Sequence, residues 1–251
     1  MLYITQSEKD AILNLFQDCD FNESELLNED NYYQKIVAKL NNKVKNFNYF
    51  NGVSKCVFLF EQYPDIVVKI PFNGGADYRS YSSSADSSND YDYDYHDESP
   101  EYYCAAWSIV NCKGMRRNWD YCEVEEILFN RAYKAGVSDY FAQTVCIGEI
   151  NGYPLYIQER AEIYSDSESK YSYKLIQELI KEIKQDLDDP DRLFGRLPEE
   201  WVCNFYVIYG RNLLKKFLDF VEEEEISDLH SDNVGFINDK PVLTDYSSFW
   251  S

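Results

Sequence analysis

Residues 226–250 read ISDLHSDNVGFINDKPVLTDYSSFW and hold the most informative pattern of the chain. Two short β-rich runs, VGFI and PVLT, flank a turn and predict a hairpin. Asp228 and Asn233 precede this hairpin, and Asp245 follows it. Because the entrance and the exit of a hairpin lie at the same end, we expect the three side chains to gather there. Carboxylate and amide oxygens are ligands that suit Mg²⁺, so the pattern favours a metal site.

Upstream of this hairpin, two further β-rich runs, residues 55–60 and 65–72, are separated by EQYP, which predicts a second hairpin. Lys69 lies near the end of its second strand. A helix is predicted over residues 119–135, where Glu125 shares one face with three apolar residues by helical spacing. A carboxylate on an apolar face requires a cation as its partner.

The motif Asp-Leu-His-x-x-Asn, followed by Thr-Asp-Tyr-Ser, resembles the catalytic loop and the metal-binding aspartate of the protein-kinase-like superfamily. Lys69 in Val-Val-Lys-Ile and Glu125 on the following helix occur in the order that the family uses. The resemblance implies an α+β, protein-kinase-like fold with two lobes: a small antiparallel-sheet N-lobe and a reduced, mostly helical C-lobe. Since the chain ends soon after Asp245, it is similar to the minimal kinases with a truncated C-lobe found among bacterial effectors.

The resemblance implies a role for each matching residue. Asp228 would orient an acceptor hydroxyl and take its proton. Asn233 and Asp245 would hold Mg²⁺, with Mn²⁺ as an alternative. Lys69, fixed by Glu125, would steady the α and β phosphates of ATP.

Two further segments match the family more weakly. Gly52 and Ser54 lie between β-like stretches, where the family carries its glycine-rich phosphate loop, but only one glycine is present. The backbone groups of Gln158, Glu159 and Arg160 would meet an adenine edge at the end of a predicted strand. The degenerate loop argues for an inactive protein, whereas the complete set of Lys, Glu, Asp, Asn and Asp argues against one.

The resemblance divides the chain into an N-terminal helical extension (1–48), a kinase-like N-lobe (49–160) and a truncated helical C-lobe with the catalytic loop (161–251). Residues 76–103 interrupt the N-lobe with eight acidic residues against one arginine and no Leu, Ile, Val, Phe or Met. Such a composition cannot build a core, so we expect a mobile insertion there.

Composition narrows the classes of partner. With 45% hydrophobic and 17% aromatic residues the chain has enough apolar surface to fold. Its net charge of −21 disfavours binding to nucleic acid and to anionic membranes. No apolar run is long enough for a membrane span, and no signal peptide is recognised. We therefore expect a cytoplasmic protein, or one delivered into another cell as an effector.

The expected function is that of an ATP- and Mg²⁺-dependent phosphotransferase, a minimal protein kinase that phosphorylates a hydroxyl of a protein substrate. A protein substrate is favoured because no C-terminal subdomain is recognised that would enclose a small molecule. One alternative is a catalytically inactive kinase-like binding protein or an acidic decoy. A second alternative is a small-molecule kinase or a nucleotidyl transferase on the same fold.

Overall fold

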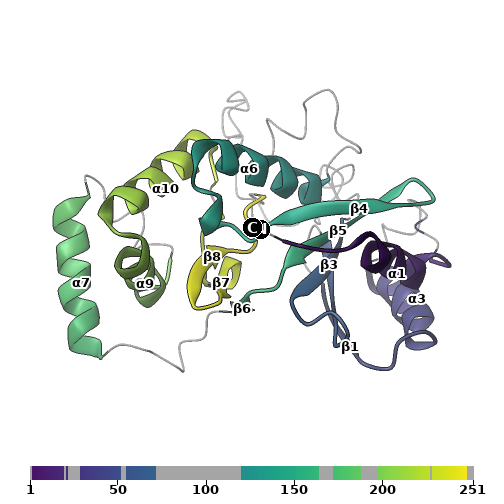
Figure 1. Ribbon diagram of the computed structural model, residues 1–251. Helices are drawn as coiled ribbons and strands as arrows, with labels where there is room; N and C mark the ends of the chain where they lie inside the picture. The colour runs from purple at the N-terminus through teal and green to yellow at the C-terminus, as the bar shows by residue number, and fades with distance from the viewer. Residues whose placement is uncertain are drawn as a thin grey trace, which may run out of the picture.

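The arrangement of helices and strands comes from a computed structural model, shown in Figure 1. It describes residues 2–19, 21, 29–51, 55–71, 120–163, 172–187, 197–226 and 228–247. The expected acidic insertion (76–103) and the expected phosphate-loop residues Gly52 and Ser54 lie outside these residues.

The described elements confirm the α+β class. A five-stranded antiparallel sheet has the order β1-β2-β3-β5-β4, and a three-stranded antiparallel sheet has the order β6-β7-β8. In chain order the elements are α1 (Gln6–Phe16), α3 (Glu29–Asn41), β1 (Phe47–Asn51), β2 (Lys55–Phe60), β3 (Ile66–Pro71), α6 (Tyr121–Ala135), the 3-10 turn η1 (Ser138–Tyr140), β4 (Thr144–Ile150), β5 (Tyr153–Glu159), β6 (Glu162–Ile163), α7 (Tyr173–Asp186), α9 (Glu199–Tyr209), α10 (Arg211–Glu223), the 3-10 turn η2 (Ser231–Asn233), β7 (Val234–Ile237) and β8 (Lys240–Leu243).

One face of the five-stranded sheet is covered by α1 and α3. Phe16 of α1 and Leu40 of α3 are fully buried in a core that includes Phe58 of β2 and Val68 of β3. The rings of Phe16 and Phe58 meet edge to face, with centroids 5.5 Å apart. Because side chains alternate along a strand, Lys69 lies on the opposite face from Val68, the face toward α6.

A second core joins α6, α7, α9 and α10 to the three-stranded sheet. Trp201 of α9 is fully buried in it, and its indole Nε1 donates to the carbonyl of Gly235 at 3.2 Å. A Cβ at Gly235 would lie 2.5 Å from the carbonyl oxygen of Glu162, so this position needs glycine for β6 to approach β7. These contacts hold the β7–β8 hairpin, and with it the motif of residues 228–245, against the helices.

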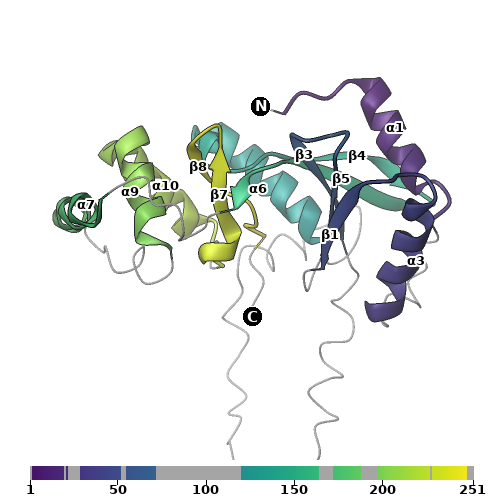
Figure 2. The same cartoon turned by 90° about the horizontal axis from the view of Figure 1, so that it is seen from below.

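The long dimension of the molecule runs from α7 at one end to α1 and α3 at the other, as Figures 1 and 2 show. The small sheet and α6 lie between these ends. Residues near the junction tie the two sheets together: the N–H of Ala142 donates to the carbonyl of Leu243 at 2.8 Å, and Phe141 forms a β-bridge with Leu243. The start of β4 therefore lies beside the end of β8.

Most local predictions hold, with instructive exceptions. The helix expected over residues 119–135 is confirmed and ends at Gly136. The sequence Asn151-Gly152 between two β-rich runs predicts a hairpin turn, which is also confirmed. One continuous helix is expected from residue 199 to about 221, but Gly210 (φ 78°, ψ 169°) breaks it into α9 and α10. Ser7, which precedes apolar residues at helical spacing, is the N-cap that the sequence favours, but the N-cap of α1 is Thr5, which forms a capping box with Glu8.

No helix among the described residues is long and apolar enough to cross a membrane.

Candidate functional site

Lys69 and Glu125 meet between β3 and α6, as their sequence pattern predicts. Lys69 Nζ lies 3.0 Å from Glu125 Oε1 and 2.8 Å from Glu125 Oε2. Both residues are sealed from solvent, with exposed fractions of 3% and 0%. A buried charge is tolerated only with a counter-charge and hydrogen bonds, so each of these residues depends on the other.

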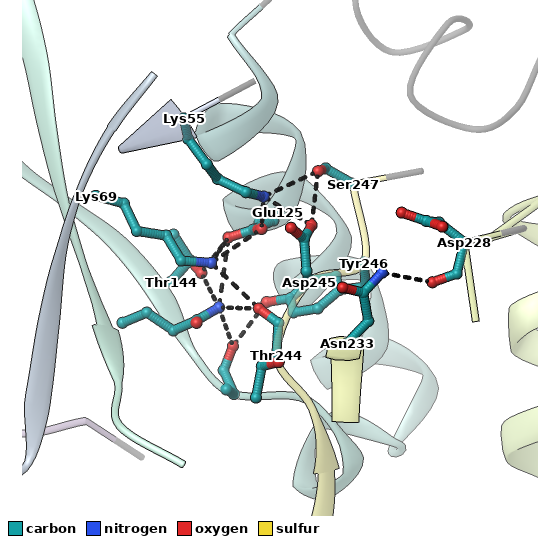
Figure 3. A network of polar contacts seen from close by, with 12 residues as sticks. Lys55, Lys69, Glu125, Thr144, Asp228, Asn233, Thr244, Asp245, Tyr246 and Ser247 are labelled. Atoms are coloured by element: carbon teal, nitrogen blue, oxygen red, sulfur yellow. Dashed lines mark hydrogen bonds and ion pairs between the residues drawn. The ribbon is translucent and has the colours of Figure 1, made fainter. Parts of the chain in front are cut away.

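Lys55, the first residue of β2, is a second buried lysine in the site. Its Nζ lies 2.5 Å from Glu125 Oε1, 2.7 Å from Asp245 Oδ1 and 3.3 Å from Ser247 Oγ. Only 4% of Lys55 is exposed. Lys55 therefore bridges the two acidic residues that the sequence motif assigns to different tasks (Figure 3).

Neutral polar groups complete the buried cluster. Thr144 Oγ1 donates to Glu125 Oε2 at 2.9 Å. The amide Nε2 of Gln158 donates to Thr144 Oγ1 and to the carbonyl of Thr244, both at 2.8 Å. Lys69 Nζ reaches the same Thr244 carbonyl at 3.1 Å. The two lysines thus face two carboxylates in a charge-balanced and hydrogen-bonded network.

The position of Asp245 is set by the backbone on each side of it. The N–H of Thr244 donates to the carbonyl of Asn233 at 2.9 Å, which closes the end of the β7–β8 hairpin. Tyr246 is fully buried, and its hydroxyl donates to the carbonyl of Ala142 at 2.8 Å. The side chain of Asp245 keeps an exposed fraction of 34%, so it lies at the border between the buried cluster and solvent.

The protonation of Asp245 and Lys55 follows from their contact. Burial by itself would raise the pKa of Asp245, but the charges of Lys55 and Lys69 outweigh it and hold that pKa well below its usual value. Burial would lower the pKa of Lys55, but Asp245 and Glu125 outweigh it and raise that pKa. Both groups are therefore charged at neutral pH.

Asp228 and Asn233 lie on the side of Asp245 away from the lysines (Figure 3). Asn233 ends the short turn η2, and its Nδ2 donates to the backbone carbonyl of Asp228 at 2.8 Å. This bond fixes the loop and leaves Oδ1 as the atom with which Asn233 could bind a cation. The expected gathering of Asp228, Asn233 and Asp245 at one end of the hairpin is thus observed.

Asp228 is partly buried, and His230 contacts it. His230 Nε2 lies 3.2 Å from Asp228 Oδ1, while His230 Nδ1 accepts from the N–H of Asp232 at 3.3 Å. Since Nδ1 accepts, Nε2 is the nitrogen that donates to Asp228. Burial raises the pKa of the Asp228 carboxyl against the lowering effect of His230, and Asp245 adds to the rise.

A cavity of about 750 Å³ lies at the ends of β3 and β5 nearest residues 66 and 159, and the residues of the buried cluster are not part of its lining. On β3 the wall includes Ile66, three residues before Lys69. On β5 it includes Glu159, the residue after Gln158. Its apolar lining comes from both sheets and includes Phe50, Leu59, Ile66 and Phe236. Two of the residues expected to contact adenine, Glu159 and Arg160, also line it.

In the segment expected to bind adenine, two backbone N–H groups donate hydrogen bonds within the protein. The N–H of Glu159 donates to the carbonyl of Gln143 at 3.2 Å, and the N–H of Arg160 donates to the carbonyl of Asp65 at 2.9 Å. Gln158 lies inside β5, paired with β3 on one side and β4 on the other, and its side chain belongs to the buried cluster. The N–H groups of Glu159 and Arg160 are therefore engaged within the protein.

The sequence analysis does not single out Lys55, although a signal for it exists. In the β2–β3 hairpin Val57 is paired with Lys69, and Lys55 lies two residues from Val57 on the same face. The register of the hairpin therefore places both lysines toward α6. Helical spacing places Glu123 and Glu126 away from the apolar face and predicts solvated side chains for both. The structure corrects this prediction: Glu123 is buried at the start of α6, and the half-buried Glu126 accepts through Oε1 from the N–H of Cys146 at 3.0 Å.

The donor set for a metal ion is small. Among the described residues, no three His, Cys, Asp or Glu side chains are grouped so that they could hold a metal. Asp245 and Asn233 offer one carboxylate and one amide oxygen. This set fits Mg²⁺ bound together with substrate phosphates, because Mg²⁺ commonly takes one or two protein carboxylates and completes its shell with phosphate and water oxygens.

Comparison of the chain with protein-family models, curated proteins and solved structures gives no match. A function therefore has to be argued from the site itself.

Proposed function

We propose that this chain is an ATP- and Mg²⁺-dependent phosphotransferase of the protein-kinase-like type, with a hydroxyl of a protein as the acceptor. The observation that carries the proposal is the buried Lys69–Glu125 pair at 2.8 Å, located beside Asp245 and the loop of Asp228 and Asn233. The sequence motifs predict this pairing from residues far apart in the chain.

The lysine side of the site suits a phosphate chain. Lys69 is held by two contacts to Glu125 and one to the Thr244 carbonyl, so its ammonium group is in place before a ligand arrives. A preorganised cation costs little reorganisation when a phosphate approaches, and such positioning provides most of the catalysis in phosphoryl transfer. Lys69 would bind the α and β phosphates of the nucleotide.

The loop side suits an acceptor hydroxyl. Asp228 is a half-buried carboxylate with a raised pKa, oriented by the Nε2–H of His230 at 3.2 Å. A raised pKa brings a carboxylate closer to the range in which a general base accepts a proton. Asp228 would orient the hydroxyl and accept its proton, and His230 would hold the carboxylate in position.

Asp245 and Asn233 would hold the metal ion between these two sides. Their oxygens are hard ligands, and Asn233 is oriented by its bond to the Asp228 carbonyl. A bound Mg²⁺ would neutralise charge on the transferred phosphate.

The cavity offers a place for the nucleotide base. It combines apolar side chains such as Phe50 and Leu59 with polar residues at the end of β5, which is the mixture typical of small-molecule sites. Leu59 in its wall lies on the same face of β2 as Lys55 and four residues from it, which corresponds to roughly 13 Å along an extended strand. That spacing suits a nucleotide with its base in the cavity and its phosphates at the lysines.

One observation favours a second candidate, a non-catalytic kinase-like binding protein. Lys55 contacts Asp245 at 2.7 Å and supplies the counter-charge that a metal ion would otherwise provide. In such a protein the buried cluster would serve only to hold the two sheets together.

Incubation of the protein with a cell lysate, Mg²⁺ or Mn²⁺ and either γ-labelled or α-labelled ATP separates these functions. The proposal expects transfer of the γ label to protein, and loss of this transfer in Asp228→Asn. Transfer of the α label would indicate nucleotidyl transfer, and γ label only in small molecules would indicate a small-molecule kinase. Absence of any transfer under both metals would favour the binding protein.

A further inference from the structure

Lys55 has no role in the proposed function, although it contacts Asp245, the expected metal ligand. Asp245 keeps an exposed fraction of 34%, but its Oδ1 already receives hydrogen bonds from both Lys55 Nζ at 2.7 Å and Ser247 Oγ at 3.2 Å. All three ammonium hydrogens of Lys55 have an acceptor, since Glu125 and Ser247 take the other two. The ammonium group of Lys55 and the Oδ1 atom of Asp245 are therefore engaged with partners within the protein.

We propose that Lys55 is a resident counter-cation that competes with divalent metal for Asp245, so that a metal ion binds there only when a phosphate chain draws Lys55 away. This inference rests on the proposed function, because it assigns a metal-binding role to Asp245. In addition, Lys55, a residue outside the sequence motifs, would control when Asp245 can bind the metal ion.

Electrostatics supports competition rather than joint binding. An ammonium group 2.7 Å from Asp245 Oδ1 and a divalent ion on the same carboxylate would lie within a few ångströms of each other. Like charges at such separation repel strongly in a site shielded from water. Asp245 can therefore be neutralised well by Lys55 or by the metal, but not by both at full strength.

The geometry also shows how Lys55 could leave Asp245 without losing every partner. Its contact to Glu125 Oε1 at 2.5 Å remains when the contact to Asp245 is broken. A polyphosphate near Lys69 offers Lys55 new oxygen acceptors. Metal binding and phosphate binding would therefore be coupled through one side chain: the phosphates remove Lys55 from Asp245, and the metal takes its place.

Lys69 supplies a matched control. Like Lys55 it is a buried lysine in contact with Glu125, but its other hydrogen bond is to the Thr244 carbonyl rather than to the Asp245 side chain. Removal of either lysine lowers the local positive charge by the same amount. If the two variants Lys55→Met and Lys69→Met differ in metal affinity, the difference is due to the lost contact with Asp245 and not to the loss of one positive charge.

The test is a titration with Mn²⁺ alone, without nucleotide, followed by electron paramagnetic resonance of the free ion. The proposal expects Lys55→Met to bind Mn²⁺ about tenfold or more tightly than the wild type, and Lys69→Met to gain only about threefold or less. Asp245→Asn in the Lys55→Met background should abolish the gain. Far-ultraviolet circular dichroism and thermal unfolding verify each variant, and Lys55→Gln replaces Lys55→Met if the latter does not fold.

Equal affinity in Lys55→Met and wild type, or an equal gain in Lys69→Met, would overturn the proposal. The result is independent of the labelled-ATP experiment, because no nucleotide is present. Failure of label transfer with a tenfold Mn²⁺ gain would reject the phosphotransferase but keep the competition at Asp245. Label transfer without an Mn²⁺ gain would reject the competition and keep the phosphotransferase.

Discussion

The two sides of the site differ in how they are held. On one side, Glu125, Lys55 and Lys69 are fully enclosed between β2, β3 and α6, and every charge meets an opposite charge within 3.0 Å. On the other side, Asp228 and His230 lie at a partly exposed loop and touch at 3.2 Å. The enclosed side is part of the folded core, whereas the loop side is an addition to its edge.

This difference predicts which substitutions change the stability of the fold and which change the chemistry of the site. A buried ion pair is costly to break because the remaining partner is left charged and without water. An exposed pair contributes little, since water and salt screen it. We therefore expect substitutions on the enclosed side to change both folding and ligand binding, and substitutions on the loop side to change chemistry with little effect on folding.

The largest expected change in stability comes from Glu125→Gln. Two buried lysines would then share only Asp245, so the free energy of unfolding should fall by about 3–5 kcal/mol. Urea denaturation measures the change. Glu178→Gln is the control, because the pair of Lys174 and Glu178 is exposed and 3.8 Å apart, and it should cost less than about 0.5 kcal/mol. Equal losses in the two variants would remove the distinction between the two sides.

A double-mutant cycle sharpens the picture of the enclosed side. Adding Lys69→Met to Glu125→Gln leaves Lys55 and Asp245 as a neutral pair, so the combined loss of stability should be smaller than the sum of the single losses by about 1–3 kcal/mol. The same cycle with Glu126→Gln in place of Glu125→Gln should show near additivity. A non-additive cycle with Glu126→Gln instead would show that Lys69 is paired with Glu126 and not with Glu125.

Asp120 gives a pH-dependent test at the start of α6. It is buried, caps the helix by accepting from the N–H of Glu123 at 2.9 Å, and accepts from the hydroxyl of Tyr156 at 2.7 Å. Burial raises the pKa of Asp120 to about 6, although these hydrogen bonds oppose the rise. A carboxyl with a raised folded-state pKa stabilises the fold below its unfolded pKa and loses that contribution as the pH rises through about 6.

The wild type should therefore gain about 1 kcal/mol of stability relative to Asp120→Asn as the pH falls from about 7 to 5. Urea unfolding of both proteins at several pH values measures this difference. A constant difference across the range would contradict a folded-state pKa of about 6 for Asp120.

The smallest expected change in stability is on the loop side. Asp228→Asn keeps the size of the side chain and removes a half-buried charge with a raised pKa, so its free energy of unfolding should change by less than about 0.5 kcal/mol. His230→Ala should behave similarly. A loss of several kcal/mol in either variant would show that the loop belongs to the folding core.

Much of the fold could be predicted because the determining signals are local. Alternating apolar residues and the turn at Asn151 and Gly152 identify β4 and β5, and Gly136 marks the end of α6. The break at Gly210 is not predicted, since the apolar pattern continues on both sides of it and only the backbone angles reveal the interruption. The strand β6 is too short to give a periodic signal.

The site could be predicted in part for a related reason. Lys69 and Glu125 each stand in a motif, and a buried acid on an apolar helix face requires a cation. The register between β2 and β3 indicates only that Lys55 lies on the same face as Lys69, whereas its role depends on the return of residue 245 to the same place, which leaves no local pattern. The roles of Gly52 and Ser54 stay predictions.

The central claim is that the enclosed side binds the nucleotide and the loop side carries out the transfer. The most direct measurement compares Asp228→Asn with Lys69→Met in two assays on the same preparations, binding of Mg-ATP and transfer of γ label to protein. The account predicts that Asp228→Asn binds Mg-ATP as the wild type does but loses transfer by about a hundredfold or more, whereas Lys69→Met loses both. Retained transfer in Asp228→Asn, or equal loss of binding in the two variants, would contradict it.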